Sequence, residues 1–129
     1  MNTLRILLVD DHAPFRRFLA EFLRVYPGIE IVGEAENGLD AVRQAERLSP
    51  DLVFMDLTMP GMNGLDATRR IKENRPGTRV VVLSSHTGEV YRRAADDSHA
   101  DGYIEKRSMK AGLSTLLSAE FPMPVRTAV

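Results

Sequence analysis

The sequence has no cysteine, no tryptophan and no excess of charge of one sign. Without cysteine it has no disulfide framework, no thiolate nucleophile and no cysteine-ligated zinc site. Its 17 Lys and Arg residues nearly balance 18 Asp and Glu residues, so the formal charge is -1. Such a chain lacks the positive charge that attracts phosphate backbones and anionic membranes. We therefore expect no direct nucleic-acid binding by this domain and no membrane association.

Long hydrophobic runs are also missing. The densest apolar runs, residues 6–9, 52–55 and 80–83, are far too short to cross a bilayer. Asp10 and Asp11 interrupt the first run, so it does not resemble the core of a signal peptide. A cytoplasmic protein is the resulting expectation.

The composition that remains is typical of one folded domain. With 129 residues, 43% of them hydrophobic and 27% charged, the chain is neither disordered nor collagen-like. No linker or repeat divides it. We expect a single domain over residues 1–121 and a flexible C-terminal tail over residues 122–129, which contains Pro122 and Pro124.

Apolar runs and helical patterns alternate along the chain. The three dense runs and two weaker ones are rich in β-branched and aliphatic residues, as in strands buried on both faces of a parallel sheet: residues 6–9, 29–32, 52–55, 80–83 and 102–104. Helical spacing of apolar residues follows each run: residues 15–23, 39–48, 65–71, 90–95 and 109–117. The pattern predicts an α/β fold of the (βα)5 type, with a five-stranded, doubly wound parallel sheet.

Polar residues stand where the predicted strands end. Asp10 and Asp11 follow the first strand, Asp56 the third, Ser84 the fourth and Lys106 the fifth. Ligands of open α/β sheets bind at this edge, where the strand order reverses. If the strand order is 2-1-3-4-5, the first and third strands are neighbours, and three carboxylates, a hydroxyl and an ammonium would come together.

Three carboxylates at one place require a compensating positive charge. A pair at about 4 Å repels by roughly 4 kcal/mol at an effective dielectric of 20. An all-oxygen ligand set favours a hard ion, and we predict Mg²⁺. Asp56 is the candidate nucleophile toward phosphorus, with Asp10 and Asp11 as metal ligands. Lys106 and Ser84 are placed to hold phosphoryl oxygens.

Each residue also has an ordinary structural explanation. Asp10 and Asp11 precede Pro14 and are compatible with capping a helix. Asp56 is compatible with a turn, and Lys106 with a solvated surface site. Ser85 competes with Ser84 for the role of the strand-end hydroxyl. His12, His86 and His99 lack a joint ligand spacing and are expected to be surface or packing residues, while Gly61 and Gly64 are expected to serve turn geometry.

Three motifs together resemble the receiver domain of bacterial two-component response regulators. They are Leu-Leu-Val-Asp-Asp-His at residues 7–12, Asp-Leu-Thr-Met-Pro-Gly-Met-Asn-Gly at 56–64 and Gly-Tyr-Ile-Glu-Lys at 102–106. The resemblance covers about residues 4–119. The Asp-Asp-His opening is most similar to the subfamily with a C-terminal helix-turn-helix. A flavodoxin-like sheet in the order 2-1-3-4-5 is implied.

The resemblance also implies a role for each site residue. Asp56 would accept a phosphoryl group, and Asp10, Asp11, Asp56 and the backbone carbonyl of Thr58 would hold Mg²⁺. In addition, Ser84 would be the switch hydroxyl, Tyr103 the switch aromatic and Lys106 the phosphate-binding lysine.

A phosphorelay function follows from the resemblance. A sensor histidine kinase or a histidine phosphotransfer protein would donate the phosphoryl group. An effector protein or a second receiver would then bind the face formed by the fourth helix, fifth strand and fifth helix, and a homodimer is possible. The domain would assist its own phosphorylation and dephosphorylation without being an enzyme for outside substrates. The alternative is a pseudo-receiver, an interaction module that signals without phosphate.

Three features depart from the family pattern. His99 stands where relatives commonly have glycine, so we expect the fourth helix to lack its left-handed cap and the following loop to be reshaped. Arg107 stands where many receivers have proline, so no cis peptide is expected. The fifth helix is expected to be short, and the chain is either a stand-alone receiver or an excised domain.

Overall fold

The computed structural model describes residues 3–120, and the expected tail over residues 122–129 lies outside them. Five strands alternate with five α-helices in the predicted order. The strands are β1 (Leu4–Val9), β2 (Ile29–Ala35), β3 (Leu52–Asp56), β4 (Arg79–Ser84) and β5 (Gly102–Glu105). The helices are α1 (Ala13–Arg24), α2 (Gly38–Leu48), α3 (Gly64–Asn74), α4 (Glu89–Asp97) and α5 (Met109–Glu120), with the 3-10 turn η1 (Lys106–Ser108) before α5.

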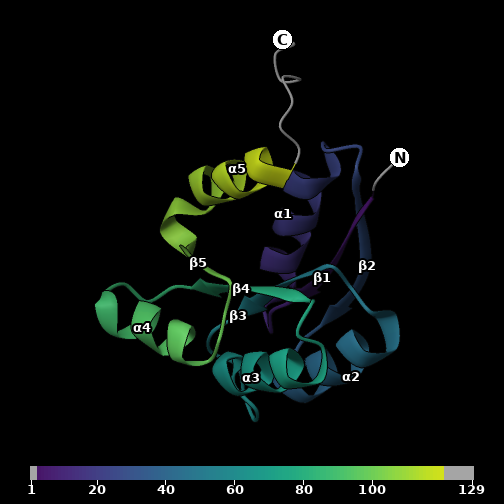
Figure 1. Cartoon of the computed structure of the whole chain (residues 1–129). Helices are drawn as coiled ribbons and strands as arrows, with labels where there is room; N and C mark the ends of the chain where they lie inside the picture. The colour runs from purple at the N-terminus through teal and green to yellow at the C-terminus, as the bar shows by residue number, and fades with distance from the viewer. Residues whose placement is uncertain (1–2, 121–129) are drawn as a thin grey trace.

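All four strand pairs are parallel, and the sheet has the order β2-β1-β3-β4-β5. The predicted (βα)5 fold and strand order are confirmed. Figure 1 shows α1 and α5 on one face of the sheet and α2, α3 and α4 on the other. The chain order reverses between β1 and β3, which are hydrogen-bonded neighbours.

The core has two layers because alternate strand residues face opposite sides of the sheet. Ile6 and Leu8 of β1 pack with Leu19 and Leu23 of α1, and Leu113 of α5 joins the same cluster. The other side of β1 packs against α2 and α3 through a second cluster, which includes Leu7, Val9, Ala41 and Ile71. Both clusters include residues of β1 and β3, so these two strands are packed on both faces of the sheet.

The expectation about His99 is wrong. His99 itself adopts the left-handed conformation, with φ of 71°. Its N–H donates to the Asp96 carbonyl at 2.9 Å, and the Ala100 N–H donates to the Ala95 carbonyl at 3.1 Å. These two bonds form a Schellman motif, which satisfies carbonyls at the end of α4. The cap is therefore kept, with a histidine in the conformation that glycine usually provides.

Other expectations about single elements have mixed outcomes. The fifth helix is not short, because α5 has 12 residues. Among the described residues no peptide bond is cis, as expected at Arg107. Gly61 has a φ of 73° and serves turn geometry. Gly64 does not, because it begins α3, and a Cβ there would collide with the backbone carbonyl of Asp56.

Candidate functional site

The carboxyl ends of the strands open into one cavity of about 470 Å³. Its lining comes from residues at or just after the ends of β1, β3 and β4. The first turn of α1 and the first residue of η1 also contribute. The lining side chains are mostly polar or charged: Asp10, Asp11, His12, Phe15, Asp56, Thr58, Ser85, His86 and Lys106. The topology thus brings together residues from both ends of the chain.

Three carboxylates meet at this cavity. Asp10, Asp11 and Asp56 each offer one oxygen, and these atoms lie within 4.8 Å of one another. Asp10 and Asp56 are buried, whereas Asp11 is exposed. An all-oxygen ligand set that leaves room for water fits a hard divalent cation. The acidic pocket is therefore one that can bind a metal.

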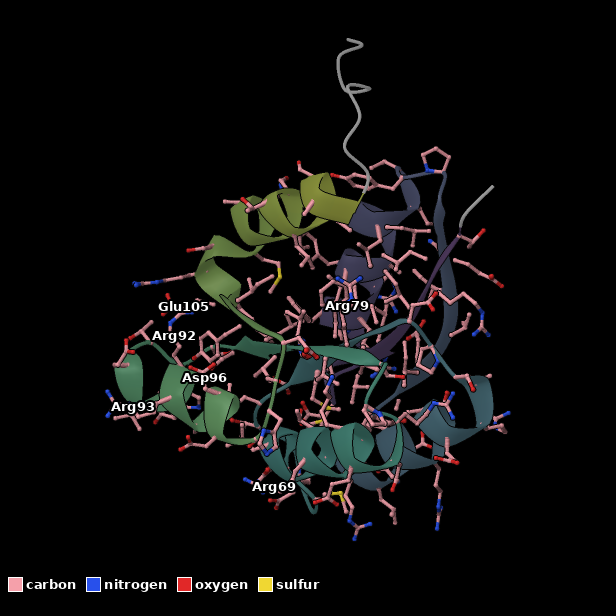
Figure 2. The ribbon with its side chains drawn as sticks, viewed as in Figure 1. Arg69, Arg79, Arg92, Arg93, Asp96 and Glu105 are labelled. Atoms are coloured by element: carbon pink, nitrogen blue, oxygen red, sulfur yellow. The ribbon has the colours of Figure 1, made fainter. Side chains whose placement is uncertain are left out.

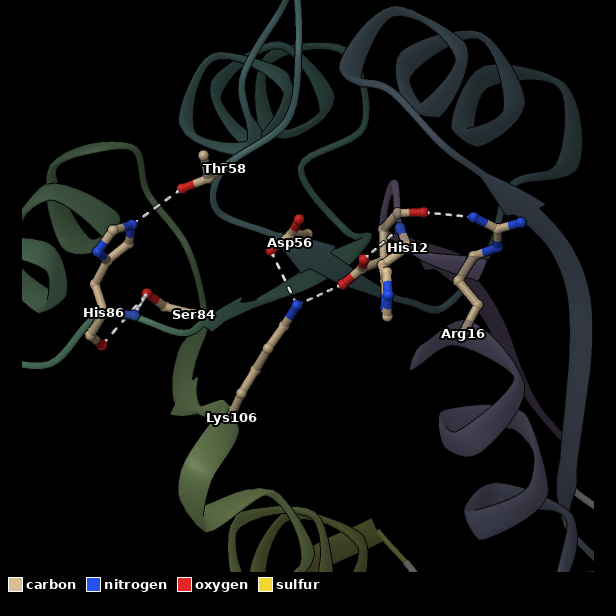
Figure 3. Close-up of polar contacts among 8 residues, drawn as sticks. His12, Arg16, Asp56, Thr58, Ser84, His86 and Lys106 are labelled. Atoms are coloured by element: carbon tan, nitrogen blue, oxygen red, sulfur yellow. Dashed lines mark hydrogen bonds and ion pairs between the residues drawn. The ribbon is translucent and has the colours of Figure 1, made fainter. Parts of the chain in front are cut away.

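Asp10 and Asp11 do not cap the following helix. The N-cap residue of α1 is His12, which makes no side-chain capping bond. Asp10 Oδ1 instead accepts the His12 N–H at 2.8 Å, and the Asp10 carbonyl accepts a hydrogen bond from Arg16 at 2.6 Å (Figure 3). These bonds fix the turn after β1 so that Asp10 faces the other carboxylates.

Lys106 lies between two of the carboxylates (Figure 3). Its Nζ is 2.7 Å from Asp10 Oδ2 and 3.3 Å from Asp56 Oδ1. Only 19% of the Lys106 side chain is exposed, so this ammonium is not the solvated surface lysine of the structural alternative. It partly neutralises the acidic cluster.

The electrostatic environment of Asp56 favours its protonated form. Burial, followed by repulsion from the Asp10 carboxylate, raises the pKa of Asp56 to about 6. The charge and hydrogen bond of Lys106 oppose this rise in pKa, and Asp11 adds a smaller repulsion. Asp56 remains mostly ionised at neutral pH. Because its carboxylate is repelled by those of Asp10 and Asp11, the site favours a bound cation.

Ser84 is the last residue of β4, is fully buried, and turns its hydroxyl toward the next loop. Its Oγ accepts the His86 N–H at 2.9 Å and donates to the His86 carbonyl at 3.4 Å. Tyr103 also donates its hydroxyl to the His86 carbonyl at 3.4 Å. Ser85, which is exposed, lines the cavity instead of Ser84. Ser84 and Tyr103 thus share one backbone partner at the rim of the site.

His86 is exposed and makes packing contacts, as expected for a histidine without a joint ligand spacing. Its Nε2 lies 3.3 Å from Thr58 Oγ1, and its ring stacks on Tyr91 with centroids 4.4 Å apart (Figure 3 shows the contact with Thr58). His86 therefore links the loop after β4 to the loop after β3 across the mouth of the cavity. The spacing of histidines along the chain indicates only metal sites, so it does not reveal a contact between two loops.

Comparison with known proteins agrees with the fold. Residues 6–118 match the response regulator receiver domain. The chain belongs to this family. It is 38% identical over 125 residues to the transcriptional regulatory protein LiaR of Bacillus subtilis (strain 168), covering 97% of this chain and 56% of that protein.

Solved receiver structures are also similar. A two-component response regulator of the LuxR family from Aurantimonas sp. SI85-9A1 has a TM-score of 0.86 and 36% identity, over 92% of this chain and 84% of that one. The response regulator domain of Thermotoga maritima CheB has a TM-score of 0.82 and 32% identity, over 92% and 93% of the two chains. This protein is therefore a receiver domain of two-component phosphorelay signalling.

The chain spans about half the length of curated relatives such as LiaR. Among residues 3–120, none of the helices is both long enough and apolar enough to cross a bilayer.

Proposed function

We propose that Asp56 accepts a phosphoryl group from the phosphohistidine of a sensor histidine kinase or a histidine phosphotransfer protein. The observation that carries the proposal is the meeting of Asp10, Asp11 and Asp56 within 4.8 Å, with the Lys106 ammonium 3.3 Å from Asp56. Carboxylates gathered against their mutual repulsion are typical of functional sites, and they favour a bound cation.

The covalent step makes Asp56 the nucleophile. A carboxylate oxygen of Asp56 forms a bond to phosphorus while the bond between phosphorus and the donor imidazole nitrogen breaks. The electron pair of that bond leaves with the imidazole, and Asp56 becomes an acyl phosphate. Because the pKa of Asp56 is about 6, the nucleophile is ionised at neutral pH, and positioning with charge neutralisation supplies the rest of the catalysis.

The other site residues hold the transferred group. Asp10, Asp11, Asp56 and the carbonyl of Thr58 would hold Mg²⁺, whose positive charge would neutralise the phosphoryl oxygens. Lys106 moves from the carboxylates to a phosphoryl oxygen as a point charge. The hydroxyl of Ser84 leaves the backbone of His86 and donates to another oxygen.

The movement of Ser84 provides the switch. Ser84 and Tyr103 both contact the His86 carbonyl, so displacing Ser84 changes the support of the Tyr103 hydroxyl. The Tyr103 ring packs under the guanidinium of Arg92 at 4.9 Å. Arg92 and Arg93 are exposed on α4 (Figure 2). Phosphorylation would thus bias the surface formed by α4, β5 and α5 toward binding an effector or a second receiver, including a second copy of this chain.

The rest of the functional assignment belongs to the same proposal. The domain assists its own phosphorylation and dephosphorylation, works in the cytoplasm, and makes no direct contact with nucleic acid or membrane. The domain itself covers residues 1–121. In a longer protein, a DNA-binding region after this domain would give the output.

Intact-mass measurement with acetyl phosphate and Mg²⁺ tests the proposal. The wild type should gain the mass of one phosphoryl group, and the gain should disappear with EDTA. Asp56→Asn should show no gain, whereas Asp51→Asn, which changes an exposed aspartate at the opposite end of β3, should behave as the wild type. An unchanged wild-type mass would favour the pseudo-receiver alternative, whereas an equal gain in Asp56→Asn would place the phosphoryl group on another residue and overturn the assignment of Asp56.

A further inference from the structure

One side chain of the cavity has no part in the function proposed above. Phe15 lies in the first turn of α1, where its N–H donates to the His12 carbonyl at 3.0 Å, and its ring lines the cavity. The helical spacing of apolar residues marks it only as part of the apolar face of α1. In the structure its ring is turned toward a residue from the other end of the chain.

The contact is with the Lys106 ammonium. Nζ of Lys106 lies 4.2 Å from the centroid of the Phe15 ring, over its face. A cation within about 6 Å of a ring face is attracted by the partial negative charge of that face. The same Nζ touches Asp10 and Asp56, so the ammonium has two carboxylates on one side and an aromatic ring on another.

The Phe15 ring is held in this position. It packs against the core cluster on the α1 and α5 side of the sheet. The Phe18 ring lies next to it, with centroids 5.9 Å apart, and Phe22 continues the row along the helix. The ring is therefore half-buried and supported by the core, whereas Lys106 has a long flexible side chain.

We infer that Phe15 is a positioning residue for phosphoryl transfer, because its ring keeps the Lys106 ammonium in the cavity when the carboxylates turn to other partners. This inference rests on the proposed function, in which Asp10 and Asp56 become ligands of a metal and release Lys106. An ammonium without those partners is free to extend into water. The ring face is a partner that neither a metal nor a phosphoryl group competes for, so Lys106 stays within reach of a phosphoryl oxygen.

Variants of Phe15 separate this role from simple packing. Phe15→Leu keeps an apolar side chain but removes the ring, and it should slow phosphorylation by acetyl phosphate about five- to tenfold at saturating Mg²⁺. Phe15→Tyr keeps the ring face and should restore the rate. Replacing Phe15 with a trifluorinated phenylalanine keeps the shape and removes the negative face, so it should slow the reaction as Phe15→Leu does. Phe22→Leu, on the same helix, should leave the rate unchanged.

A spectroscopic measurement on the metal-free protein tests the contact without any reaction. Protons on the terminal methylene of Lys106 should be shifted upfield by the ring current of Phe15, and this shift should vanish in Phe15→Leu. Lys106→Ala identifies the signals.

The outcomes distinguish this inference from the proposed function. A wild type that gains no phosphoryl group overturns the proposed function and this inference with it. A wild type that is phosphorylated, with Phe15→Leu reacting at the same rate, overturns the inference alone. Equal loss of rate in Phe15→Leu and Phe15→Tyr, a trifluorinated variant as fast as the wild type, or the absence of an upfield shift would do so as well.

Discussion

At the scale of single residues, the charge of Asp56 opposes folding above its pKa. The pKa rises from about 4 in an unfolded chain to about 6 in the folded protein. The folded state therefore binds more protons than the unfolded state between these values, and the free energy of unfolding falls as the pH rises through this window. Stability that is fully present below pH 4 is lost by the time the pH passes 6.

The first prediction is that Asp56→Asn stabilises the metal-free protein at neutral pH. A shift of about two pKa units corresponds to about 3 kcal/mol, so the variant should gain about 2–3 kcal/mol at pH 7 and little near pH 4. Urea denaturation in EDTA across this pH range measures the difference. The exposed Asp97→Asn serves as a control and should show no such trend. A gain in Asp56→Asn that does not change with pH would contradict this account.

His99 allows a second prediction for a single residue. A side chain in the left-handed region costs about 1–2 kcal/mol because its Cβ approaches the following carbonyl oxygen. His99→Gly removes this contact and keeps the Schellman bonds, so it should raise the free energy of unfolding by about 1 kcal/mol. His99→Ala retains a Cβ at the same φ and should gain nothing. Thermal denaturation of both variants decides, and an equal gain from alanine would show that the backbone conformation is not the cause.

At the scale of elements, α3 begins against the strand end that carries Asp56. A Cβ at Gly64 would meet the carbonyl oxygen of Asp56 and the Cα of Leu57, which are backbone atoms that cannot move aside alone. The helix can therefore approach β3 this closely only with glycine at its first position. This close approach fixes the direction in which the chain leaves Asp56.

The third prediction compares two glycine substitutions. Gly64→Ala should destabilise the protein by about 1–3 kcal/mol, in the range of overpacked cores, and should slow phosphorylation of Asp56. Gly77→Ala is the matched control, because a Cβ there meets no heavy atom within 4 Å, and it should change stability by less than about 1 kcal/mol. Chemical denaturation and the phosphorylation rate measure both effects. Tolerance of alanine at residue 64 would mean that α3 is not tightly held.

The elements also show how far sequence reasoning reaches. The ends of β1, β3 and β5 were predictable because short apolar runs mark buried strands and parallel strands end at one edge. With the strand order that the family resemblance implied, the meeting of Asp10, Asp56 and Lys106 followed. The direction of the Ser84 hydroxyl did not follow, because it depends on the conformation of the loop that presents the His86 backbone. The cap at His99 did not follow either, since two hydrogen bonds at the end of α4 hold a histidine in the conformation that glycine usually provides. Loop conformation and long-range contact carry this information, and neither has a periodic signal.

At the scale of the whole molecule, the site lies where both layers of the core end. Asp10 follows β1 and Asp56 ends β3, and these strands contribute to both core clusters. Lys106 adds a connection from the segment after β5, which leads into α5. The repulsion among the carboxylates therefore acts on the strands that hold the two layers together, and its relief should stabilise the entire fold rather than one loop.

The fourth prediction is that Mg²⁺ raises the temperature of global unfolding, with an effect that depends on pH. An ion that binds only the folded state stabilises it by about 2.7 kcal/mol at one hundred times the dissociation constant. Asp56 must lose its proton to act as a ligand, so stabilisation by Mg²⁺ should be larger at pH 7 than at pH 5, below the Asp56 pKa of about 6. Calorimetry with and without Mg²⁺ at matched ionic strength measures this. Asp11→Asn should lose most of the effect, whereas Glu46→Gln on α2 should retain it. If Mg²⁺ raises the unfolding temperature equally in Asp11→Asn and the wild type, the ion acts away from the three carboxylates. Only binding at their shared site would make the stability of both core layers depend on the charge at residue 11.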